Sequence, residues 1–198
     1  PPLRNRLLGV GLPRDIAVVI IFGLCFSLWG STMGFDWLGH HLNLRAIGII
    51  IAGILGGPRA GALVGLLGGG QYVLRVHPEG FPWDLAASIL DGWLAGRMSV
   101  RRERMFVGWR VLSGAALVQL AGLSVTASGL GVTGGNPVAA LPSLLAQLVG
   151  VAVGVALFVN VALVVISRQD QAVALVEARA AADAMSLTAL RNRLEPHF

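Results

Sequence analysis

Three ionisable residues lie at the ends of long apolar segments, where charges at membrane depth usually have a function. Arg45 opens one segment, Arg75 closes the next and Asp84 opens the one after that. Guanidinium groups bind carboxylates through two parallel hydrogen bonds. We therefore predict that Arg45 and Arg75 converge on a small anion. The alternative is that both arginines are interfacial anchors whose side chains reach lipid headgroups.

Two further sets of polar residues have a different expected role. Asp91 and Arg110 fall toward the same end of neighbouring apolar segments. We predict that they form a buried structural pair, because loss of one partner would leave an unpaired charge in hydrocarbon. His40, His41 and His77 lie in adjoining loops, but no carboxylate or cysteine completes a metal-ligand set at a recognisable spacing. We predict no metal site.

The composition of the 198-residue chain predicts a membrane protein. The chain is 55% hydrophobic and only 13% charged, and its mean hydropathy is +0.75. These are too few charges to cover a soluble domain. The 15 basic residues are all arginine and are dispersed along the chain, which argues against a nucleic-acid partner. The single cysteine, Cys25, excludes an intrachain disulfide.

Six apolar segments predict the fold class, an all-α polytopic protein with six transmembrane helices. About 20 apolar residues cross the hydrocarbon layer of a bilayer. The expected spans cover residues 15–30, 45–56, 58–74, 81–98, 106–127 and 139–167. The second and third spans are short, and one kinked helix is the alternative. Pro58 favours two helices joined by a tight turn, because proline suits the first turn of a helix.

The arginines predict the orientation of these spans, since cytoplasmic loops collect positive charge. With six spans and an inside N-terminus, most arginines fall in cytoplasmic segments, namely Arg4, Arg6, Arg14, Arg59, Arg97, Arg101, Arg102, Arg104 and Arg168. Only Arg45 and Arg75 lie in the outside segments. We predict that both termini are cytoplasmic and that the protein is multi-pass in the lipid bilayer.

Glycines recur at four-residue spacing through the second and third spans. Gly53, Gly57, Gly61 and Gly65 would form a flat stripe on one helix face. Such a stripe lets another backbone approach closely. We assign these glycines, together with Pro58, to packing and not to ligand binding.

The composition changes after residue 167, where we place a second domain, 168–198. Residues 168–194 contain no glycine or proline and have strong helix propensity. Their heptad positions are Val173, Val176, Ala180, Asp183, Leu187, Leu190 and Leu194. This seam predicts a parallel coiled coil and hence a homodimer, and the alternative is a helix that lies on its own protomer or on the membrane. His197 follows this helix, and imidazole is a competent nucleophile near neutral pH.

Two stretches of the chain resemble the LytS/YehU family of bacterial sensor histidine kinases. Residues 43–69 read as Asn-x-Arg, a small-residue helix, Gly-Gly-Pro and a second glycine-rich helix. This order is similar to the receptor signature of the family. Residues 189–198 are similar to its phospho-acceptor box, which usually has Gln at the position of Arg193 and Asn at that of Glu195.

The resemblance implies a function for the whole assembly. His197 would accept phosphate from ATP, bound with Mg in a following catalytic domain, and pass it to a LytTR-type response regulator. The ligand would be a small extracellular carboxylate such as pyruvate. Asn43, which opens the signature, joins Arg45, Arg75 and Asp84 as a predicted ligand-binding residue. We expect a location in the bacterial inner membrane, no cofactor in the 198 residues themselves and a longer parent protein.

The chain departs from the family pattern at two places. The family commonly has His-Arg after the second glycine-rich helix, where this chain has Gln71-Tyr72 and, three residues later, Arg75. The family's Glu-Gly in the next helix appears as Asp91-Gly92. The alternative function is the substrate-binding membrane subunit of an energy-coupling-factor transporter. Such a subunit also has six glycine-rich spans, but it needs no heptad that ends in Pro-His-Phe.

Overall fold

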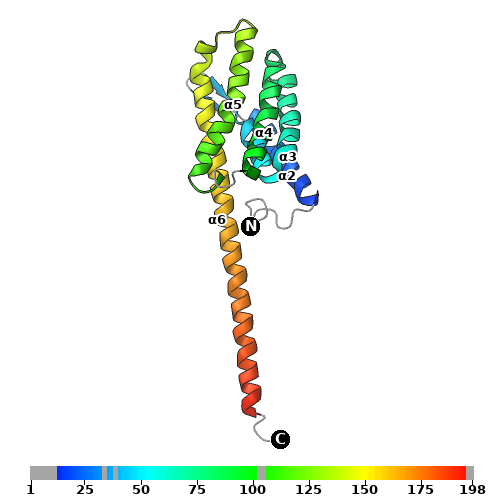
Figure 1. Cartoon of the computed structure of the whole chain (residues 1–198), viewed down its shortest axis with the longest axis vertical. Helices are drawn as coiled ribbons and strands as arrows, with labels where there is room; N and C mark the ends of the chain where they lie inside the picture. The colour runs from blue at the N-terminus through cyan, green and yellow to red at the C-terminus, as the bar shows by residue number, and fades with distance from the viewer. Residues whose placement is uncertain (1–12, 33–34, 38–39, 102–105, 195–198) are drawn as a thin grey trace. The chain divides into compact units, whose positions relative to one another are not determined.

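The computed structural model describes residues 13–32, 35–37, 40–101 and 106–194. Most of them lie in the helices α2 (Pro13–Thr32), α3 (Arg45–Arg75), α4 (Trp83–Arg101), α5 (Arg110–Val132) and α6 (Pro137–Leu194), which Figure 1 labels. A short 3-10 helix, η1 (Pro78–Gly80), precedes α4. The predicted helical class is therefore confirmed. The sequence did not predict the small antiparallel hairpin of β1 (Phe35–Trp37) and β2 (His40–Leu42).

Helix α3 is a hairpin of two antiparallel helical arms. Gly57 interrupts it with φ 83° and ψ −178°, a conformation that glycine adopts without a steric penalty. A methyl group built at Gly61 would lie 2.7 Å from the Cα of Gly53. The Cζ of Arg45 lies 3.8 Å from the centre of the Tyr72 ring, although these two residues would be about 40 Å apart in a straight helix. The predicted two helices, and not one kinked helix, are confirmed.

The arms of α3 form the centre of the first unit of the fold. They make most of their contacts with α4 and then with α2, and Figure 1 shows these helices side by side. The backbones of α3 and α4 approach closely where glycines meet. A methyl group built at Gly61 would lie only 2.6 Å from the carbonyl carbon of Gly92. Gly65 faces Ser88 of α4 in the same way. The largest fully buried side chains of α3 are Ile49, Ile50, Ile51, Ile54 and Val64.

Three helices among the described residues are long and apolar enough to cross a membrane, Arg45–Arg75, Arg110–Val132 and Val138–Ala189. The apolar stretch Ile16–Thr32 of α2 is shorter. Helix α4 carries Asp84, Asp91 and Arg97, and these charges lower its hydropathy. The helices support a membrane protein, and the count of six spans stays a prediction.

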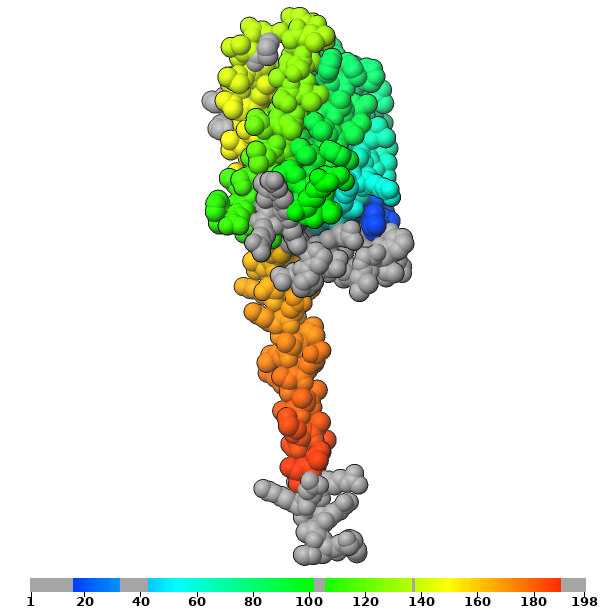
Figure 2. All heavy atoms as spheres, in the orientation of Figure 1, coloured from blue at the N-terminus to red at the C-terminus, as the bar shows by residue number. Residues whose placement is uncertain are grey.

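The chain divides into two compact units, Pro1–Asn160 and Val161–Phe198. The described part of the second unit is the end of α6. Every described side chain from Ser167 to Ala189 is exposed, and Figure 2 shows this segment as a single column of spheres. The helix that we predicted after residue 167 is present, while the coiled coil stays a prediction. His197 lies outside the described residues.

Candidate functional site

A polar cavity of about 130 Å³ lies within the first unit. It is larger than one water molecule needs and well below the size of drug-binding pockets. Its polar lining comes from both arms of α3, the loop after it, α4, α5 and α6: Asn43, Arg45, Tyr72, His77, Asp84, Ser88, Asp91, Gln119, Thr126 and Gln147. The structure thus brings together Asn43, Arg45 and Asp84 of the four predicted ligand-binding residues.

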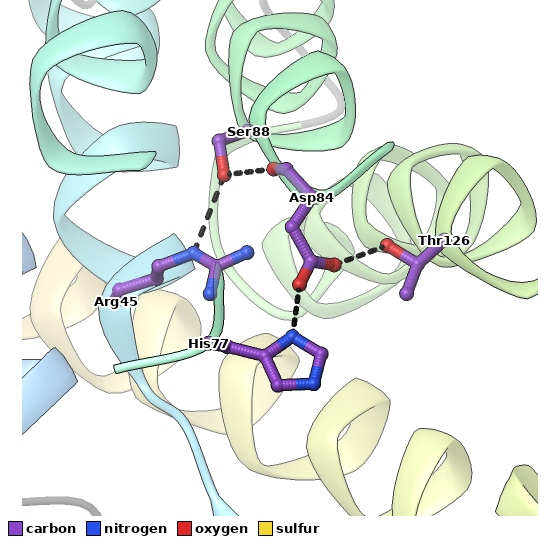
Figure 3. A network of polar contacts seen from close by, with 5 residues as sticks. All are labelled: Arg45, His77, Asp84, Ser88 and Thr126. Atoms are coloured by element: carbon purple, nitrogen blue, oxygen red, sulfur yellow. Dashed lines mark hydrogen bonds and ion pairs between the residues drawn. The ribbon is translucent and has the colours of Figure 1, made fainter. Parts of the chain in front are cut away.

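Arg45 is held in place from several sides. Its side chain is buried, with 6% of the residue exposed. The Oδ1 atom of Asn43 accepts a hydrogen bond from the backbone N–H of Arg45 at 2.9 Å, where α3 begins. The guanidinium Nε donates to Ser88 Oγ at 3.3 Å, as Figure 3 shows, and the group stacks on the ring of Tyr72. A guanidinium has five N–H donors, so donors remain for a ligand.

Asp84 connects α4 to α5 and to the loop after α3. Its Oδ2 lies 2.9 Å from His77 Nδ1, and its Oδ1 accepts a hydrogen bond from Thr126 Oγ1 at 3.1 Å (Figure 3). Ser88 Oγ donates to the backbone carbonyl of Asp84 at 2.7 Å while it accepts from Arg45. Both carboxylate oxygens of Asp84 therefore have partners within the protein, and Ser88 links the backbone carbonyl of Asp84 to Arg45.

Asp91 does not pair with Arg110, and the predicted pair is corrected. Asp91 lies in the middle of α4, is 4% exposed and lines the same cavity as Arg45. Arg110 is exposed at the first residue of α5, and its Cζ lies 6.0 Å from the centre of the Trp109 ring. The helix begins four residues later than the predicted span, which leaves Arg110 at its end. Gly122 of α5 makes room for the Asp91 carboxyl group.

Arg75 does not line the cavity, so its predicted convergence with Arg45 is wrong. The residue is exposed in the last turn of α3. Tyr72, one turn earlier, takes the place beside Arg45, and an aromatic face attracts a guanidinium where a second guanidinium would repel it. Among the described residues that line the cavity, Arg45 is the only arginine.

A second cavity of about 430 Å³ shares His77, Asp84 and Thr126 with the first. The remainder of its lining comes from the loop before α4 and the end of α5, including Glu79, Trp83, Gly129 and Thr133. The hydrogen bonds of Asp84 with His77 and Thr126 therefore lie where the two cavities meet.

Sequence reasoning did not assign Ser88, Gln119 or Thr126 to the site. One signal was available: positions 84, 88 and 91 are spaced by four and three residues, so they share a face of α4. No comparable spacing joins Gln119 and Thr126 of α5 to that face, since their role depends on how α5 is rotated against α4.

Comparisons with known proteins agree with the helical architecture. Residues 6–127 match the family described as the 5TMR of 5TMR-LYT. The chain is 35% identical over 106 residues to the sensor histidine kinase BtsS of Escherichia coli strain K12, and equally to that of Shigella flexneri. The match covers 48% of this chain and 17% of each relative, so the chain spans about a sixth of the length of the curated relatives it matches. No solved structure matches the chain.

Proposed function

The chain belongs to the 5TMR family of 5TMR-LYT, a family of membrane receptor domains, and on this basis we propose that it is the sensor portion of a two-component histidine kinase. The resemblance to LytS/YehU kinases is confirmed. Residues 6–127 comprise most of five helical segments, which are α2, the two arms of α3, α4 and α5. Helix α6 would add the sixth predicted span, and both termini would then be cytoplasmic in a bacterial inner membrane.

The ligand of this sensor is a small carboxylate. The observation that carries this proposal is the buried guanidinium of Arg45 at the wall of a cavity of about 130 Å³. A buried charge is costly unless it is paired, and Arg45 forms no ion pair within 4 Å among the described residues. Ser88 and Tyr72 hold its side chain in one position, which lowers the entropic cost of binding.

The ligand enters from outside the cell. The predicted topology places the loop from Val76 to Pro82 at the outer face, because arginines concentrate in the segments assigned to the other side. Both cavities include residues of this loop or of the adjoining start of α4, notably His77 and Asp84. The larger cavity is thus the vestibule and the smaller one the binding chamber.

The signal leaves through α6 as a proposed dimeric helix. This helix carries Gln147, which lines the chamber, and its helical geometry continues to Leu194. Its exposed heptad would pair with the same seam in a second copy. His197 would then be phosphorylated by ATP with Mg in a catalytic domain of the whole kinase. A LytTR-type response regulator would receive the phosphate.

Thermal unfolding of the purified protein in lipid nanodiscs tests the ligand class. The panel consists of two- to four-carbon carboxylates that carry keto, hydroxyl or amino groups. We expect at least one to stabilise the wild type, by about 2.7 kcal/mol at a hundred times its dissociation constant. Arg45→Gln should remove this stabilisation, because the substitution deletes the cation.

Arg75→Gln is the matched control, since Arg75 is exposed and outside the cavity. It should respond like the wild type. Stabilisation by the carboxylate that persists in Arg45→Gln, or that is lost in Arg75→Gln, would contradict this assignment of the site.

A further inference from the structure

The chamber contains buried polar atoms that no protein group satisfies. They are Asn43 Nδ2, Asp91 Oδ1 and Gln119 Oε1, each without a hydrogen-bond partner. The three residues are 5%, 4% and 2% exposed, and all three line the chamber. Buried polar groups almost always have partners. A bound ligand that supplies one acceptor for Asn43 and donors for Asp91 and Gln119 would complete all of them.

The unsatisfied atoms include both kinds of hydrogen-bonding group. Asn43 Nδ2 is a donor. The Oδ1 atom of the same side chain accepts a hydrogen bond from the backbone N–H of Arg45. Asp91 Oδ1 is an acceptor on α4, and Gln119 Oε1 is an acceptor on α5. The chamber thus offers donors from the start of α3 and acceptors from α4 and α5.

The unsatisfied acceptors of the chamber argue against a plain carboxylate as the ligand. Asp84 has His77 and Thr126 as partners, so Asp91 is the carboxyl group left for a ligand. A plain carboxylate could accept hydrogen bonds from Arg45 and Asn43, but it has no donor for Asp91 Oδ1 and Gln119 Oε1. A ligand that carries an ammonium group beside its carboxylate would supply those donors.

We propose that the chamber binds a small zwitterion, an amino acid, with its carboxylate on Arg45 and Asn43 and its ammonium group on Asp91 and Gln119. The proposal rests on the proposed function, because it keeps Arg45 as the carboxylate-binding residue. The volume of about 130 Å³ restricts the ligand to a molecule with few heavy atoms. The described residues that line the chamber include one arginine, Arg45, and two carboxyl groups, those of Asp84 and Asp91.

Three probes of the same size separate this proposal from a receptor for plain carboxylates. L-Alanine, L-lactate and pyruvate differ only at the second carbon, which carries an ammonium, a hydroxyl or a keto group. We expect calorimetric titration of the nanodisc protein to give the order L-alanine, L-lactate, pyruvate, from tightest to weakest. The difference between the first and the last should be at least about tenfold, because a site built for a donor rejects an analogue that lacks it.

Asp91→Asn provides the variant test, since it removes the charge and keeps the size of the side chain. The preference for L-alanine over L-lactate should disappear in this variant. Asp170→Asn, an exposed change in the second unit, is the matched control and should keep the wild-type order. Because the three probes are first compared on the wild type, the test remains decisive if Asp91→Asn does not fold.

The outcomes separate the two proposals. If pyruvate binds as tightly as L-alanine, the zwitterion proposal is overturned, while the small-carboxylate function stands. If L-alanine binds best and Asp91→Asn leaves its preference unchanged, Asp91 is not the ammonium partner and the proposed geometry is wrong. If none of the three probes binds to the folded protein, the zwitterion proposal is overturned, and the small-carboxylate function fails as well only if the whole panel of two- to four-carbon carboxylates gives no stabilisation.

Discussion

The glycines of the α3 hairpin and the heptad residues of the last part of α6 both recur at regular helical spacing, but the described residues of the two sets differ in exposure. Glycines repeat every four residues in α3, and Gly53, Gly61 and Gly65 lie against α4. The heptad residues Val173 and Leu187 of the second unit are 58% and 67% exposed. Spacing therefore identifies the face of a helix that will be covered, but it does not say which molecule covers it.

The chemistry of each stripe suggests what covers it. A glycine stripe brings two backbones close together and gives little apolar area of its own, so it needs a rigid neighbour that is always present. An apolar heptad gains free energy mainly from burial against a second helix. We infer that α3 is covered by the fold itself and that the tail is covered by another copy of the chain.

Gly61→Val should give the largest effect, since it breaks the covered region. Even a methyl group built at this position would lie too close to the Gly92 backbone, and overpacking of this kind costs about 1–3 kcal/mol or more. We expect a large loss of folded protein, measured by size-exclusion yield and thermal unfolding in detergent.

Gly70→Val is the control for this change. Gly70 lies in the same helix, but a methyl group built there has no atom within 4 Å. This variant should remain folded. Equal losses for the two variants would show that close α3–α4 contact does not determine the stability of the fold.

Leu187→Asp changes the exposed tail and should give a smaller effect, which concerns association of the tails and not folding of the receptor. Removal of an apolar seam residue should weaken association of the tails by at least about tenfold, while receptor unfolding changes by no more than about 0.5 kcal/mol, as for other exposed sites. Association is measured by disulfide cross-linking through Ser186→Cys in a Cys25→Ser background. Leu175→Asp, outside the heptad, should leave cross-linking intact, and an equal loss there would argue against the seam.

Much of the fold could be predicted because local chemistry determines it. Pro58 after two glycines indicated the turn that splits α3, and Gly57 adopts the positive φ that this turn requires. The helical tail followed from the absence of glycine and proline. The β1–β2 hairpin has strands of only three residues, which is too short to give a periodic pattern.

The site was predictable in part. Arg45 and Asp84 were predicted from their positions at segment ends and Asn43 from the receptor signature, and all three line one cavity. The predicted positions of Arg75 and Arg110 were wrong because charge complementarity in a sequence does not specify helix rotation. Tyr72 takes the position expected of Arg75, and Asp91 lines the cavity with Arg45 and does not meet Arg110.

We propose that occupation of the chamber changes the separation of two tails paired in a dimer, and an electron-spin distance measurement tests this directly. Spin labels at Ser186→Cys in a Cys25→Ser background would report the separation of the two tails in nanodiscs. We predict a defined distance that shifts by about 1–2 Å or more with the carboxylate that stabilises the protein most, and no shift in Arg45→Gln. A distance that stays unchanged at saturating ligand, or the absence of any coupling between the labels, would contradict this account.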